Sequence, residues 1–101
     1  MKFRVRFTEE ARTDLKRLYA FALEQADGNW SVAEGAMDAI SQGFTLLEAN
    51  PFACRKVGES SLLRELIIGY GSSGYLALVE IGNDLLVTVL AVRHQREDDY
   101  H

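Results

Sequence analysis

The chain has 101 residues, of which 48% are hydrophobic and 26% are charged. This length accommodates one hydrophobic core, so we predict a single domain over residues 1–101, and the composition excludes a disordered chain. The net charge of −4 argues against a protein whose whole surface binds nucleic acid, although it leaves room for a local basic patch.

Cysteine content and hydropathy indicate the compartment. Cys54 is the only cysteine, which excludes an internal disulfide framework and the paired spacing of a zinc site. The first seven residues carry no signal-peptide core, and no apolar run reaches the 18 residues that a membrane span needs. We therefore predict a cytoplasmic protein with no metal, no cofactor and no membrane contact, and the sequence assigns no role to Cys54.

The chain begins with the period-two pattern of a strand. Apolar and basic residues alternate over Lys2, Phe3, Arg4, Val5, Arg6 and Phe7. A helix from 9 to 26 follows, with Thr8 as its N-cap and Glu9 and Glu10 in the first turn, where the helix dipole favours negative charge. Its end is predicted at Asp27-Gly28-Asn29, because Gly and Asn tolerate the left-handed conformation.

A second helix is predicted from 32 to 49. Ser31 and Glu34 have the spacing of a capping box, and Pro51 ends the helix because proline cannot continue it. Gly35 and Gly43 lie in its interior, where each costs about 1 kcal/mol relative to alanine. Either a row of small residues approaches the first helix closely, or a modestly stable helix tolerates the glycines; the row is Val32, Ala36, Ala39 and Gly43.

The second half of the chain reads as three strands after a loop at 50–61. The strands are expected at 62–68, 75–81 and 85–93, with a flexible hairpin loop at 69–74 and a tight turn at 82–84. The fold class is therefore α+β, in the order β-α-α-β-β-β. An antiparallel hairpin sheet carries a two-helix hairpin on one face.

The last two strands are apolar on both faces. If the helices cover one face, the other must present one of two alternating sets. These sets are Leu76, Leu78, Leu86 and Leu90, or Ala77, Val79, Val87 and Val89. Small monomers seldom expose such a patch, so we predict a protein partner there. The alternative is that the loop at 51–57, or the C-terminal tail, folds over this face.

Three stretches together resemble the RelE/ParE superfamily of toxins from type II toxin–antitoxin systems, and the ParE branch in particular. They are RFTEEARTDLKRL at the start, LRELIIGYGSSGYLALVEI in the middle and VLAVRHQRED near the end. The resemblance covers nearly the whole chain. It implies a toxin of the plasmid-stabilisation type, neutralised in a hetero-oligomer by a ParD-like antitoxin.

The resemblance also implies site residues. A ParE-like toxin inhibits DNA gyrase and needs only a binding surface, for which Arg93, His94 and Arg96 are the expected target contacts. The expected antitoxin contacts are apolar positions of the sheet and first helix: Leu76, Leu78, Leu86, Leu90, Leu15 and Leu18.

A RelE-like toxin would instead be a ribosome-dependent mRNA endoribonuclease. Such chemistry needs an acid, a base and cations for the phosphate, roles that His94, Arg96, Arg93 and Tyr100 have the side chains to fill. Glu97, Asp98 and Asp99 oppose this because carboxylates repel a phosphate. A third alternative is an inactive toxin fold that only binds its antitoxin, and Arg64 with Glu65 could form an internal ion pair rather than a site.

Overall fold

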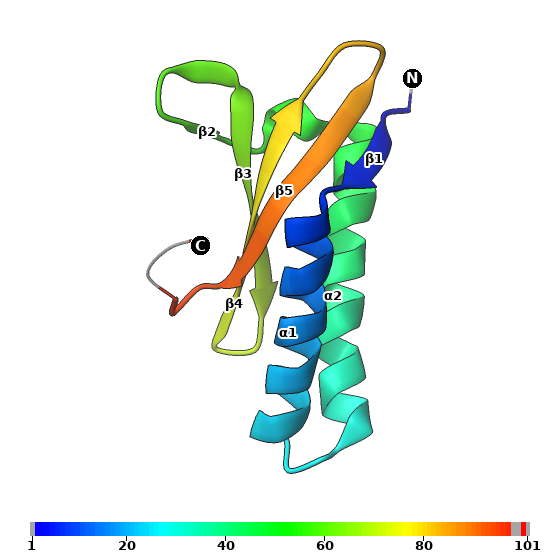
Figure 1. Ribbon diagram of the computed structural model, residues 1–101, viewed down its shortest axis with the longest axis vertical. Coiled ribbons are helices and arrows are strands. Elements are labelled where there is room, and N and C mark those ends of the chain that lie inside the picture. The colour runs from blue at the N-terminus through cyan, green and yellow to red at the C-terminus, as the bar shows by residue number, and fades with distance from the viewer. Residues whose placement is uncertain (1, 98–99, 101) are drawn as a thin grey trace.

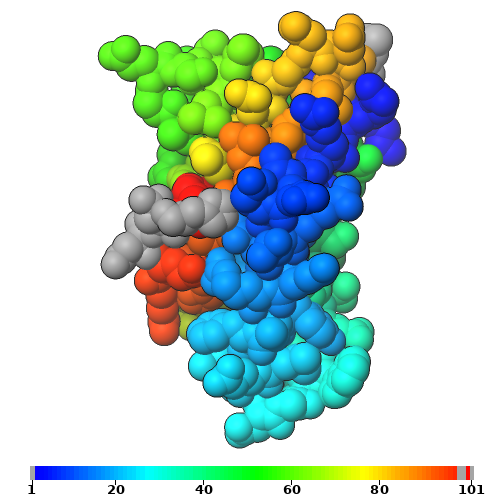
Figure 2. Space-filling view, viewed as in Figure 1, coloured from blue at the N-terminus to red at the C-terminus, as the bar shows by residue number. Residues whose placement is uncertain are grey.

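The computed structural model describes residues 2–97 and residue 100 (Figure 1). In chain order its elements are β1 (Arg4–Phe7), α1 (Glu9–Gln25), α2 (Trp30–Ala49), the 3-10 turn η1 (Pro51–Ala53), β2 (Arg55–Val57), β3 (Ser60–Tyr70), β4 (Ser73–Ile81) and β5 (Leu86–His94). The molecule is elongated, with extents of 42 × 28 × 25 Å. In the space-filling view the tip of the helical hairpin forms one end and the β2–β3 and β4–β5 turns form the other (Figure 2).

The five strands form one sheet in the order β1-β5-β4-β3-β2. The pairs from β2 to β5 are antiparallel, whereas β1 runs parallel to β5, so that Arg4 lies opposite Leu86 and Phe7 opposite Val89. The two helices pack against one face of this sheet. The predicted α+β class and helical cover are confirmed, and the structure adds a fifth strand and a parallel pair.

Helix α1 begins and ends as its sequence predicts. The Thr8 hydroxyl accepts a hydrogen bond from the Ala11 amide at 3.1 Å, which satisfies one of the free N–H groups of the first turn. At the other end the Gly28 amide donates to the Leu23 carbonyl at 2.8 Å, and Asp27 takes the left-handed conformation with φ of 53°. This is the Schellman arrangement, and it turns the chain directly into α2.

Helix α2 begins two residues earlier than predicted. Asn29 is the N-cap, and its side chain accepts from the Ser31 amide at 3.1 Å, so Ser31 lies inside the helix. The predicted Ser31–Glu34 capping box is therefore wrong, because Asn29 is an equally good cap placed closer to the preceding turn. As expected, Pro51 follows the end of the helix, and it also opens the unpredicted turn η1.

The two glycines of α2 face the sheet and not α1, which corrects the predicted close approach of the helices. A Cβ at Gly43 would lie 2.9 Å from Ile68 Cγ1 and 3.3 Å from Leu66 Cδ2. A Cβ at Gly35 would lie 2.7 Å from the Tyr70 hydroxyl. Glycine at these two positions therefore leaves room for the large side chains of β3, and the contact that requires glycine is with the sheet.

The segment predicted as a loop at 50–61 contains ordered structure. It holds η1 and the short edge strand β2, and β3 begins at Ser60. The predicted flexible loop at 69–74 is also wrong, since β3 and β4 continue to a two-residue turn at Gly71 and Ser72. Gly71, with φ of 61°, supplies the left-handed conformation that lets the turn be this tight.

The register decides which alternating set faces the helices. Ala77, Val79, Val87 and Val89 are each fully buried in the core beneath α1 and α2. Leu76 and Leu78 therefore belong to the opposite face, which we call the open face. Phe7 of β1 packs edge-on against Phe44 of α2 with ring centroids 5.0 Å apart, and so closes the core at its β1 side. Within the part of the chain that the structure describes, no helix is long and apolar enough to cross a membrane.

Candidate functional site

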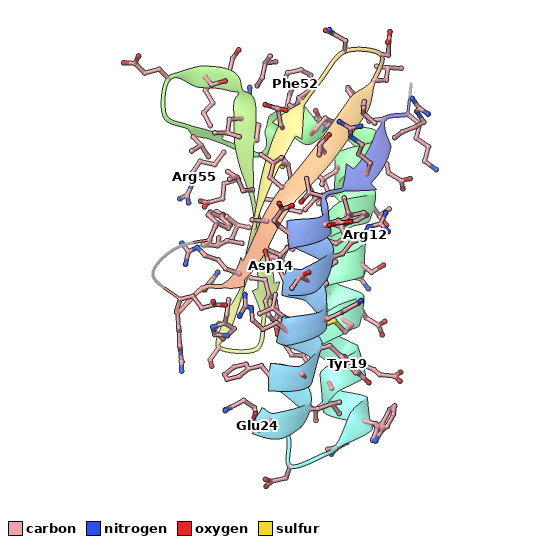
Figure 3. The ribbon with its side chains drawn as sticks, in the orientation of Figure 1. Arg12, Asp14, Tyr19, Glu24, Phe52 and Arg55 are labelled. Carbon is pink, nitrogen blue, oxygen red and sulfur yellow. The ribbon has the colours of Figure 1, made fainter. Side chains whose placement is uncertain are left out.

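The geometry of β5 is set by a bulge that α1 holds in place. The pairing of β4 with β5 shifts register between Leu78 and Val79, and the extra residue in β5 is Leu90. The Thr8 hydroxyl donates to the Leu90 carbonyl at 3.0 Å, and the Val92 amide donates to the Asp14 carboxylate at 2.9 Å. Asp14 is 4% exposed and lies on the side of α1 toward β5 (Figure 3). Side chains of α1 and of its N-cap residue thus satisfy backbone groups around the bulge.

Arg93 and His94, which follow the bulge, project to opposite faces of the sheet. His94 stacks edge-on against Tyr75 at 5.5 Å on the helix side, and Ser73 Oγ lies 3.1 Å from its Nε2. The Arg93 guanidinium instead lies 5.1 Å from the centre of the Tyr100 ring and donates to the Glu97 carbonyl. Alternation along the strand therefore separates two neighbouring residues into two sites.

The open-face site consists of Arg55, Glu65, Arg93 and Tyr100. The Tyr100 hydroxyl donates to Glu65 Oε2 at 2.5 Å, and Arg55 pairs with the other carboxylate oxygen of the same residue. Since Glu65 lies opposite Leu78, and Arg93 lies opposite Leu76, the Tyr100 ring spans from β5 to β3 across the middle of the sheet. Figure 2 shows the red end of the chain beside β5, and Figure 3 shows Arg55 beside β2 and β3.

The predicted Arg64–Glu65 ion pair is wrong, because consecutive strand residues point to opposite faces. Glu65 takes Arg55 as its cation. Arg64 donates to the Phe52 and Cys54 carbonyls at 2.8 and 3.0 Å and so anchors η1 to the sheet. Burial raises the pKa of the nearby Cys54 thiol, and the positive charge of Arg64 offsets part of that rise.

A second site, the helix-side groove, lies between the helical hairpin and the β3–β4 turn. Its volume is about 610 Å³, within the range of small-ligand and side-chain pockets. The groove has an apolar floor with polar groups at its rim. Six of its lining residues are Phe21, Val32, Tyr70, Tyr75, His94 and Arg96.

Glu97 holds the chain at the rim of this groove. Its carboxylate accepts from the His94 amide at 2.9 Å and from Arg17 at 3.1 Å. Partial burial opposes the charged form, but these hydrogen bonds and the charge of Arg17 outweigh it and lower the pKa of Glu97. The Glu97 carboxylate thus stabilises the backbone at the end of β5. Asp98 and Asp99, the other two predicted carboxylates, lie outside the described residues.

Comparison with known families decides the relationship. Residues 5–99 match the family model described as "ParE toxin of type II toxin-antitoxin system, parDE". The chain belongs to the ParE toxin family. Among solved structures, this ParE-family chain is similar to a chain of the toxin–antitoxin complex RelBE2 from Mycobacterium tuberculosis, with a TM-score of 0.58 and 21% identity. The match covers 94% of this chain and 100% of the other, and at that identity it supports the fold alone. No protein of curated function matches the sequence.

The residues predicted for a nuclease do not form one cluster in this ParE-family toxin. Arg93 and Tyr100 are in contact on the open face, whereas His94 faces the helices. The Arg96 side chain is exposed at the rim of the helix-side groove, and its backbone amide donates to His94 Nδ1 at 3.2 Å. The predicted target contacts Arg93, His94 and Arg96 are divided in the same way.

The residues predicted to contact the antitoxin fall into two groups, one on the sheet and one on α1. Leu76 is buried and Leu78 half-buried on the open face, and Leu86 and Leu90 are half-buried on β5. The two leucines of α1 are different: Leu18 is 1% exposed and Leu15 packs against the core, so Leu18 offers no surface to a partner. Helical periodicity identifies the apolar stripe of α1, but that stripe faces the sheet.

Arg55 and Glu65 are site residues that sequence reasoning missed. Arg55 was hidden because β2 is only three residues long and shows no alternation. Glu65 carried a signal, since a carboxylate in the middle of the apolar run from Leu62 to Ile68 requires a partner when buried. The sequence could not identify that partner, because Arg55 and Tyr100 reach Glu65 only through the fold.

Proposed function

We propose that this ParE-family protein is the toxin of a type II toxin–antitoxin pair that inhibits DNA gyrase and is neutralised in the cytoplasm by a cognate ParD-like antitoxin. The observation that carries the proposal is the match of residues 5–99 to the ParE toxin family. The architecture supports it, since a gyrase inhibitor needs a shaped surface and not a complete catalytic set.

The end of β5 is the surface that we assign to the target. Arg96 is exposed and lies beside the helix-side groove, which also contains His94. Arg93 contacts Tyr100 and the Glu97 carbonyl on the other face of the sheet. It therefore helps to fix the position of the residues that follow β5. A cation next to an apolar groove is a typical anchor for a protein partner, because Arg and aromatic residues dominate interface energies.

The test is a gyrase supercoiling and cleavage assay with toxin freed of its antitoxin. We expect the wild-type protein to inhibit supercoiling, and Arg96→Ala to weaken inhibition by about tenfold or more, the effect of one interface arginine. Arg12→Ala is the matched control, because Arg12 is also exposed but lies on α1 away from the groove. Undiminished supercoiling in the presence of folded wild-type protein would overturn the gyrase proposal.

The open-face site favours a second candidate, the ribosome-dependent endoribonuclease. It places a tyrosine hydroxyl on a buried carboxylate between two arginines, a set that is able to move a proton beside a phosphodiester. The protein would be added to translating ribosomes with mRNA. Codon-phased cuts that disappear in Tyr100→Phe would establish this function, and their absence with active gyrase inhibition would exclude it.

Expression without the antitoxin distinguishes both from an inactive fold. We expect either kind of toxin to arrest growth, and co-expression of the neighbouring reading frame to reverse that arrest. If the folded protein neither arrests growth nor acts in either assay, it is an antitoxin-binding module only.

A further inference from the structure

The chain turns sharply at the end of β5, from His94 to Glu97. The Glu97 amide donates to the His94 carbonyl at 3.1 Å, and the His94 amide donates to the Glu97 carboxylate at 2.9 Å. These bonds close a β-turn in which Arg96 occupies the third position. The Arg96 side chain is exposed and lines the helix-side groove, so the backbone of this turn decides where its guanidinium lies.

A side-chain hydrogen bond also holds this turn. The Arg96 amide donates to His94 Nδ1 at 3.2 Å. An amide N–H can only donate, so Nδ1 carries a lone pair and no proton. A side-chain acceptor that takes the N–H two residues later is the arrangement of an Asx turn, in which aspartate or asparagine normally supplies an oxygen. In this turn the imidazole of His94 takes that role.

The ring that accepts this bond is itself fixed by β4 and α1. Ser73 Oγ lies 3.1 Å from His94 Nε2. Because Nδ1 has no proton, the neutral ring carries its proton on Nε2 and donates it to Ser73. The rings of Tyr75 and Phe21 meet the imidazole edge-on, with centroids 5.5 and 6.3 Å away. The imidazole therefore connects a strand of the sheet to the turn that carries Arg96.

We propose that His94 is a positioning residue for target binding: its ring, oriented by Ser73, holds the turn so that the Arg96 guanidinium lies at the rim of the helix-side groove. The inference rests on the proposed function, because it takes Arg96 as the target contact. It gives the two residues different roles, since Arg96 touches the target and His94 acts through Arg96. The half-buried ring already contacts Phe21, Ser73 and Tyr75, which occupy much of its surface.

Two substitutions at His94 separate the contacts of its two ring nitrogens. Asparagine places its side-chain oxygen near the position of Nδ1, so it keeps an acceptor for the Arg96 amide and loses the contact with Ser73. Glutamine is longer by one methylene, so its amide reaches toward the position of Nε2 and leaves the Arg96 amide without this acceptor. The two variants therefore carry the same functional group and differ in which contact they retain.

The folded variants are compared in the gyrase supercoiling assay. We expect His94→Gln to inhibit about tenfold less well than wild type, which is the loss expected for Arg96→Ala, and His94→Asn only about threefold less well. If the ring itself touched the target, that contact would be lost in both variants. Equal losses in the two variants would therefore overturn the positioning role.

A double-mutant cycle shows whether His94 acts through Arg96. If it does, His94→Gln causes little further loss once Arg96→Ala is present, because the side chain that the ring positions is already absent. We expect the double variant to match Arg96→Ala within about twofold. Losses that multiply would mean that His94 contributes independently, as a direct contact or through stability alone, and they would overturn the inference.

Nuclear magnetic resonance tests the turn without gyrase. In His101→Gln, which leaves His94 as the only histidine, we expect nitrogen-15 shifts of an unprotonated Nδ1 and a protonated Nε2 in mildly alkaline buffer. We also expect the Arg96 amide to exchange with solvent about tenfold faster in His94→Gln than in wild type. A proton on Nδ1, or equal exchange in the two proteins, would overturn the inference.

Failure of this inference is distinguishable from failure of the proposed function. If the folded wild-type protein does not inhibit gyrase, the proposed function fails and the target role of His94 fails with it. If the wild-type protein inhibits gyrase while the losses in the cycle multiply, the positioning role alone fails.

Discussion

A single buried carboxylate connects α1 to β5. Asp14 accepts from the Val92 amide next to the bulge, and the pair is buried. We expect Asp14→Ala to lower the free energy of unfolding by about 1–3 kcal/mol, because it leaves a buried N–H without its acceptor. Urea denaturation measures this. Asp38→Ala is the control, since Asp38 is exposed on α2, and an equal loss in both variants would contradict the role of Asp14.

Gly43 is required by contact with β3. Alanine would gain about 1 kcal/mol in helix propensity, but its Cβ would meet Ile68 and Leu66, both buried and unable to withdraw, at an overpacking cost of about 1–3 kcal/mol. We therefore expect Gly43→Ala to destabilise the protein by about 1 kcal/mol. In Gly35→Ala the Cβ meets only the end of the Tyr70 side chain, so the change should be near neutral. A higher midpoint of thermal unfolding for Gly43→Ala would refute the steric explanation.

At the scale of elements, Arg93 is one of the residues that connect β5 to Glu97 and Tyr100. Its guanidinium contacts both the Glu97 carbonyl and the Tyr100 ring. We expect Arg93→Ala to accelerate digestion of the C-terminus by a carboxypeptidase about tenfold, because local opening becomes easier. Arg96→Ala should leave the rate unchanged, since the contacts found for Arg96 in the structure use its backbone. Equal acceleration by both variants would show that charge alone, and not contact, retains this segment.

The contribution of the Glu97 carboxylate to stability depends on pH. The folded state lowers the pKa of this carboxyl below its usual 4.5, so its contribution to stability is present above that value and disappears as the pH falls through the folded pKa. We expect the stability difference between wild type and Glu97→Gln to shrink between about pH 6 and pH 3. Urea titrations at a series of pH values measure it, and a difference that grows on acidification would contradict this assignment.

The elements differ in how well the sequence predicts them. Helix α1 and strand β1 carry local signals, the Thr8 cap and the alternation of Phe3, Val5 and Phe7, and the structure confirms both elements. Strand β2 was missed because three residues beside a turn have no period of their own. The site was harder still, since Glu65, Arg93 and Tyr100 meet through strand register and a bulge. These depend on long-range pairing, which no local pattern encodes.

At the scale of the whole molecule, strand order brings three arginines of an acidic chain to the open face. Arg6 on β1 donates to Thr88 on β5 at 2.9 Å, and Arg55 and Arg93 lie on the same open face. The net charge of −4 excludes a wholly basic surface but says nothing of this face. Composition therefore argued only against a wholly basic surface, and strand order was needed to decide where the cations lie.

We expect the two ends of the chain to unfold as one cooperative unit. Strand β1 pairs with β5, and the N-cap Thr8 bonds to the carbonyls of Val89 and Leu90, so neither the helices nor the sheet has a core of its own. We expect one calorimetric transition with an unfolding enthalpy of about 60–80 kcal/mol and equal calorimetric and van't Hoff values. Phe7→Ala should lower stability by about 3 kcal/mol because it removes the Phe44 contact, and it should shift this transition without splitting it. A second transition in wild type or variant would mean that the helical hairpin unfolds apart from the sheet.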